Sequence, residues 1–107
     1  METFRKTTHL SEIIEASEKS PAIIFIYSNS CNTSAYLEAE IEKNILEKKI
    51  KYPVYQITVQ TEPSLSKRIE EYFAIKHESP QIIILDKGKV ILTAHHKDIQ
   101  IQSLMHF

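Results

Sequence analysis

The sequence predicts an α/β fold in which a mixed β-sheet is flanked by α-helices. Short apolar runs alternate with amphipathic runs along most of the chain, which is typical of parallel strands joined by helical crossovers. Two later apolar runs are separated only by residues 86–88, so they predict a hairpin at an antiparallel edge. With 107 residues, 42% of them hydrophobic, we expect a single domain over residues 1–107.

The first expected elements are a helix, a central strand and a longer helix. Leucine and isoleucine recur at helical spacing over residues 10–14, after two threonines that can cap a helix, and Pro21 ends this run. Every position of residues 22–27 is apolar, as expected for a strand covered on both faces. The second helix is expected over about residues 33–49, with its glutamates early and lysines at its end, where they complement the helix dipole.

The second half of the chain predicts three more strands and two more helices. Residues 54–59 are rich in β-branched side chains and predict a core strand. A helix opens at Pro63, a residue suited to the first helical position, and ends near Ala74. Residues 81–85 and 89–93 form the predicted hairpin, and apolar residues from about Asp98 onward predict a last helix.

The charge balance excludes several classes of partner. Thirteen basic and 14 acidic side chains give a formal charge of −1. The chain therefore lacks the excess of positive charge that is typical of proteins that bind nucleic acid or an anionic membrane. The N-terminus has no apolar signal core, and no apolar run is long enough to span a bilayer. We therefore expect a cytoplasmic protein, and a lone cysteine agrees with a reducing compartment.

Cys31 is the only cysteine and stands between the first predicted strand and the second helix. Free N–H groups and the positive dipole end at a helix N-terminus favour a thiolate there. Ser34 occupies the second cysteine position of a C-x-x-C dithiol motif, so the expected chemistry is monothiol exchange. The alternative is a buried structural cysteine, against which the polar neighbours argue.

The residues around the thiol each have a structural and a functional interpretation. Ser34 can hydrogen-bond the thiolate or satisfy the first turn of the helix, and Asn32 and Thr33 are either ordinary helix-start residues or active-site contacts. Ser79 and Pro80 either break a loop or align a bound disulfide beside the thiol.

His95 and His96 are adjacent on an extended segment, where neighbouring side chains point to opposite faces. We therefore expect no metal site, and no tightly bound cofactor is expected.

Three features together resemble the thioredoxin fold over nearly the whole chain. They are the thiol after the first central strand, the helix that follows at once, and the Ser79–Pro80 pair before the hairpin. In that family the late proline is cis and its loop lies against the active thiol. The resemblance implies a thioredoxin-like mixed β-sheet flanked by α-helices, a cis Ser79–Pro80 bond, and Pro80 opposite Cys31.

The chain is also similar to the monothiol bacilliredoxins of the YtxJ type. The similarity is carried by Cys-Asn-Thr-Ser-Ala at residues 31–35, His-Glu-Ser-Pro-Gln at residues 77–81, Asp-Lys-Gly-Lys-Val at residues 86–90, and a histidine-containing turn. The chain departs from the family at Asn32, where a proline is common, and at His96, where an aromatic residue is expected. The resemblance implies reduction of mixed disulfides between bacillithiol and client proteins, with bacillithiol as the low-molecular-weight thiol co-substrate.

Three functions stay open at this point. A monothiol disulfide reductase that acts through Cys31 is preferred. The alternatives are a redox-silent thioredoxin-like binding adaptor and a thiol sensor or peroxidase. A low thiol pKa, an exposed sulfur and turnover of a mixed disulfide distinguish the reductase from the adaptor, whereas peroxidase chemistry requires rapid sulfenate formation.

Overall fold

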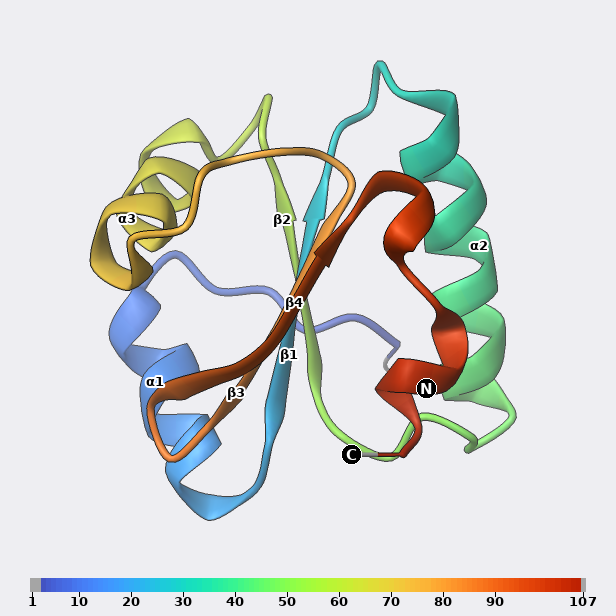
Figure 1. Cartoon of the computed structure of the whole chain (residues 1–107), viewed down its shortest axis with the longest axis horizontal. Coiled ribbons are helices and arrows are strands. Elements are labelled where there is room, and N and C mark those ends of the chain that lie inside the picture. Colours follow the sequence, from blue (N-terminus) through green and yellow to red (C-terminus); the bar gives the residue numbers. More distant parts are fainter. Residues whose placement is uncertain (1–2, 107) are drawn as a thin grey trace.

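A four-stranded mixed sheet forms the centre of the molecule. The computed structural model describes residues 3–106 (Figure 1). In spatial order the strands are β2 (Val54–Thr58), β1 (Ala22–Tyr27), β3 (Gln81–Asp86) and β4 (Lys89–His95). Strands β1 and β2 are parallel, while β3 is antiparallel to both β1 and β4. The predicted parallel pair with an antiparallel hairpin at its side is confirmed.

Helices cover both faces of this sheet. Helices α1 (Leu10–Lys19) and α3 (Pro63–Phe73) lie on one face, and α2 (Asn32–Leu46) lies on the other (Figure 1). The face that α2 covers is shared with two short 3-10 helices, η1 (His96–Asp98) and η2 (Ile101–Leu104). The sheet is therefore an inner layer, which explains why its central strands are apolar at nearly every position.

Strand β1 shows how one apolar run serves two cores. Ile24 and Ile26 pack with α1 and α3, whereas Ile23 and Phe25 pack with α2 and the C-terminal segment. These four side chains are at most 1% exposed. Burying each such side chain contributes about 1.5–3 kcal/mol to folding. Because β1 is buried on both faces, its C-terminal end, from which the next loop departs, is held in place.

The expected last helix is wrong. Ile99 and Gln100 are extended, with φ/ψ of −74°/122° and −117°/126°, and they separate η1 from η2. Ile99 and Leu104 both belong to the apolar cluster on the α2 side. In an α-helix, five residues would rotate them about 140° apart, so one regular helix could not bury both. Tertiary packing thus overrides the helical pattern of this short segment.

Two other boundaries differ from the expectation. Helix α1 begins at Leu10 with His9 as its N-cap, and Thr7 instead accepts the His9 N–H through Oγ1 at 3.2 Å. Helix α2 starts one residue before Thr33 and ends at Leu46, because Lys48 turns the chain with a φ of 62°. The earlier start places Cys31 directly at the helix N-cap.

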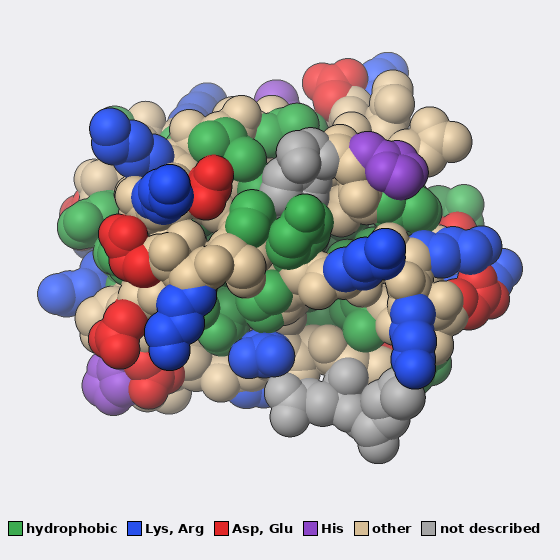
Figure 2. Space-filling model, turned by 90° about the horizontal axis from the view of Figure 1, so that it is seen from below, with side chains coloured by type: hydrophobic (Ala, Val, Ile, Leu, Met, Phe, Trp, Pro, Cys, Tyr) green, Lys and Arg blue, Asp and Glu red, His purple; other side chains and the backbone are tan. Residues whose placement is uncertain are grey.

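The surface facing away from the β1–α2 loop carries charges of both signs. Figure 2 shows Lys and Arg side chains interspersed there with Asp and Glu, and apolar side chains between them. Within residues 3–106, no helix is both long enough and apolar enough to cross a membrane.

Candidate active site

Cys31 is the N-cap residue of α2 and is half-exposed. The chain leaves β1 at Tyr27 and turns through residues 28–30 before the helix begins; we call residues 28–34 the thiol loop. Two backbone bonds fix Cys31 in the turn: its N–H donates to the Ser28 carbonyl at 3.3 Å, and its carbonyl accepts the Ala35 N–H at 3.1 Å. The sulfur therefore sits at the positive end of α2, within reach of solvent.

The surroundings of the sulfur lower the pKa of the Cys31 thiol below its ordinary value. The largest cause is the Ser34 backbone N–H, with smaller contributions from the Ser34 hydroxyl and from the N–H and hydroxyl of Thr33, and partial desolvation opposes them. The Cys31 side chain makes no capping hydrogen bond to α2, so these groups act on the sulfur as oriented dipoles. Such dipoles stabilise the anion more than the neutral thiol, which favours the nucleophilic thiolate.

Ser34 lies on the first turn of α2 and contacts the turn that precedes the helix. Its side chain is fully buried, and its Oγ accepts the Ser28 N–H at 3.3 Å. The same hydroxyl lowers the Cys31 pKa, so it joins the turn to the sulfur. Asn32 and Thr33, by contrast, are exposed on the first turn of α2.

Sequence reasoning missed Gln60. Its Oε1 accepts the Asn29 N–H at 3.1 Å, and its Nε2 donates to Oγ of Ser28 at 2.8 Å and to Oγ of Ser30 at 3.4 Å. A signal existed: Gln60 follows the end of β2, and parallel strands β1 and β2 bring their C-terminal ends to one edge of the sheet.

The predicted proline lies at the same end of the sheet as the thiol. Register pairs Gln81 of β3 with Ile26 near the end of β1, so Pro80, the residue before Gln81, comes beside the strand end from which the thiol loop departs. The start of β3 and the end of β1 lie together in Figure 1. The Ser79–Pro80 bond is cis, as the resemblance implied. Pro80 is buried, Ser79 is half-buried, and the Pro80 carbonyl accepts the His96 N–H at 3.0 Å.

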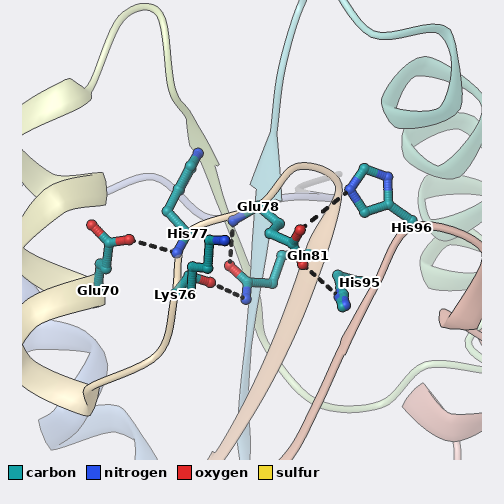
Figure 3. A network of polar contacts seen from close by, with 7 residues as sticks. All are labelled: Glu70, Lys76, His77, Glu78, Gln81, His95 and His96. Atoms are coloured by element: carbon teal, nitrogen blue, oxygen red, sulfur yellow. Dashed lines mark hydrogen bonds and ion pairs between the residues drawn. The ribbon is translucent and has the colours of Figure 1, made fainter.

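Polar side chains anchor residues 76–81, which we call the proline loop (Figure 3). From α3, Glu70 accepts the His77 N–H through Oε2 at 2.6 Å. Gln81, only 5% exposed, accepts the Glu78 N–H through Oε1 at 3.4 Å and donates to the Lys76 carbonyl at 3.2 Å. The loop is therefore held from α3 and from within its own turn.

The Glu78 carboxylate adds a third attachment, to the end of β4. Its Oε2 lies 2.7 Å from Nδ1 of His95, and its Oε1 lies 3.9 Å from Nε2 of His96 (Figure 3). The expectation that the two histidines point to opposite faces is wrong, because His96 leaves the strand with a φ of 54° and strand alternation ends there. Among residues 3–106 no group of three or more potential ligands could hold a metal ion.

His77 belongs to the proline loop and is turned toward α3. Its Nδ1 lies 3.2 Å from Oγ of Ser66. The two tyrosines that flank the thiol loop also differ: Tyr27 is half-buried and packs edge-on against Phe25, whereas Tyr36 on α2 is 66% exposed.

Comparison with known proteins agrees with this architecture. A family model described as "Monothiol bacilliredoxin BrxC" matches residues 2–104. A solved thioredoxin-fold protein to which oxidoreductase activity has been ascribed is 26% identical, with a TM-score of 0.80 and coverage of 95% of this chain and 90% of that one.

Two thioredoxins are similar in fold at lower identity. A mutant thioredoxin from Halobacterium salinarum is 13% identical with a TM-score of 0.70, covering 94% of this chain and 82% of that one. Oxidised mitochondrial thioredoxin 3 from Saccharomyces cerevisiae is 17% identical with a TM-score of 0.68, covering 94% and 89%. The thioredoxin-like fold is thus confirmed.

Proposed function

Because this chain belongs to the monothiol bacilliredoxin family, we propose that it removes bacillithiol from client proteins by thiol–disulfide exchange at Cys31. The chain is a thioredoxin-fold oxidoreductase of that family. The observation that carries the proposal is a half-exposed thiol at the N-cap of α2, with its pKa lowered by the first turn of the helix. A redox-silent adaptor has no need of this arrangement.

The proposed exchange has two balanced steps. First, the Cys31 thiolate attacks the bacillithiol sulfur of the mixed disulfide; the bond to the client sulfur breaks, and the client leaves as a thiolate that takes a proton from water. Cys31 then carries bacillithiol in a new disulfide. A second bacillithiol, as thiolate, attacks the bacillithiol sulfur of that disulfide, which regenerates the Cys31 thiolate and releases bacillithiol disulfide.

We assign the supporting roles to both loops. Thr33 and Ser34 stabilise the thiolate through their N–H groups and hydroxyls, and Asn32 borders the sulfur on the first turn of α2. Within the described residues 3–106, the Ser79 N–H and carbonyl make no hydrogen bond, so this backbone can pair with an extended client segment beside the thiol. Pro80 holds that backbone at the sheet end.

The test is release of bacillithiol from a purified bacillithiolated client, with free bacillithiol present. We expect turnover by the wild type and none by Cys31→Ser, because a serine hydroxyl without an activating base is a poor nucleophile. Circular dichroism serves as the control for folding. Release by folded Cys31→Ser would eliminate the mechanism. A wild type inactive toward several mixed disulfides would favour the adaptor, and rapid sulfenate formation with peroxide would favour the sensor or peroxidase.

A further inference from the structure

Gln60 takes no part in the exchange steps, yet its side chain makes three hydrogen bonds to the thiol loop. It follows Val59, whose N–H donates to the Tyr27 carbonyl at 2.9 Å and so continues the pairing of β2 with β1 beyond the strand ends. The backbone of Gln60 therefore starts from a fixed point at the same sheet edge as the thiol loop.

Both the oxygen and the nitrogen of the Gln60 side-chain amide form hydrogen bonds with successive residues of the turn. The oxygen accepts the Asn29 N–H, while the nitrogen donates to the hydroxyls of Ser28 and Ser30. Those two hydroxyls also lie 3.1 Å from each other. One planar group thus restrains three consecutive residues. Ser28 is only 6% exposed, and its Oγ also accepts the Ser30 N–H at 3.4 Å, so the 2.8 Å bond from Gln60 is the shortest that this hydroxyl makes.

Ser28 transmits this restraint to the sulfur. Its carbonyl accepts the Cys31 N–H, and its N–H donates to Oγ of Ser34, each at 3.3 Å. Any displacement of Ser28 therefore moves Cys31 and Ser34 relative to each other. We propose that Gln60 is a positioning residue for Cys31: its amide holds residues 28–30 so that the sulfur stays over the first turn of α2. The inference rests on the proposed role of Cys31 as the nucleophile.

The expected effect is modest because the Gln60 side chain is itself exposed. Water can replace part of what the amide supplies, so removing it costs about a threefold loss in the rate of exchange. If the Cys31 sulfur is held less firmly, the pKa of its thiol should also change. When the sulfur samples places away from the Ser34 and Thr33 N–H groups, its pKa rises toward the ordinary thiol value.

The experiment measures alkylation of Cys31 by iodoacetamide as a function of pH in full-length protein. Gln60→Met keeps the length and removes the amide, and the exposed Gln100→Met is the matched control. We expect the Gln60→Met profile to shift to higher pH and the Gln100→Met profile to overlay the wild type. A purely structural role would lower thermal stability without moving this profile.

A double-mutant cycle with Ser28→Ala makes the test specific. Gln60→Met and Ser28→Ala remove the same hydrogen bond, so the double variant should shift less than the sum of the single shifts. An unshifted Gln60→Met profile in folded protein, or additive shifts, would overturn the inference; Gln60→Ala replaces the methionine variant if that one does not fold. Alkylation needs no bacillithiol, so the result is independent of whether the proposed client reaction occurs.

Discussion

The thiol loop and the proline loop lie at the same end of the sheet but are held by different forces. In the thiol loop, every side chain except Cys31 is non-ionisable, and its contacts are hydrogen bonds among serines, backbone groups and Gln60. The proline loop is held by the Gln81 amide and, unlike the thiol loop, also by carboxylates and imidazoles (Figure 3). Cys31 is thus the only ionisable side chain of the thiol loop.

The difference has a functional consequence. A carboxylate near the sulfur would disfavour the thiolate, and an imidazolium would make its ionisation depend on a second titration. In the proposed mechanism, nucleophile chemistry is therefore assigned to the thiol loop and client docking to the proline loop, which carries the ionisable groups. One segment serves both loops, because Gln60 bonds the thiol loop whereas Ser66 and Glu70, further along the same segment, bond the proline loop.

Among the variants that distinguish the thiol loop from the proline loop, Ser34→Ala should have the largest effect. Removing this buried hydroxyl takes away one of the groups that lower the Cys31 pKa and leaves the Ser28 N–H without its acceptor. We expect the rate of bacillithiol release to fall about tenfold, because the thiolate loses part of its stabilisation and a buried donor loses its partner.

The pH dependence of alkylation shows in which direction Ser34→Ala shifts the pKa of the Cys31 thiol. The wild-type alkylation rate should fall only as pH drops through the lowered thiol pKa, whereas in Ser34→Ala the fall should begin at a higher pH. Ser64→Ala, in the exposed first turn of α3, is the matched control. A superimposable Ser34→Ala profile would show that the thiol loop does not tune the sulfur.

A smaller effect is expected from Glu78→Gln in the proline loop. The amide oxygen can still accept from His95, but the negative charge that faces both imidazoles is lost. Because partly exposed ion pairs contribute little, KM for a bacillithiolated client should rise about twofold at low salt, with kcat unchanged.

Salt separates this variant from those in the thiol loop. The Glu78→Gln difference should vanish at high ionic strength, while that of Ser34→Ala should persist. The exposed Glu71→Gln on α3 controls for net charge. A salt-independent loss of kcat in Glu78→Gln would contradict the assignment of nucleophile chemistry to the thiol loop and of client docking to the proline loop.

The sequence predicted the parts of this arrangement that depend on local pattern. The all-apolar run of β1, the helix after Cys31 and the proline before the hairpin could be identified from the sequence, and the resemblance to the thioredoxin fold that they carry implied that Pro80 lies opposite Cys31. Gln60 and Ser28 were missed because their contact joins segments 32 residues apart in the chain. His96 and the C-terminal segment were misassigned because a positive φ and the burial of Ile99 and Leu104 are tertiary effects.

The most direct measurement is the intact mass of the wild-type protein after a single turnover with a bacillithiolated client and no free bacillithiol. Because the chain has one cysteine, it has no second thiol that could displace the transferred bacillithiol. We predict that one bacillithiol accumulates on this chain for each client thiol freed, and that added bacillithiol removes it. A freed client with no adduct on Cys31, or no transfer by folded protein, would contradict monothiol exchange.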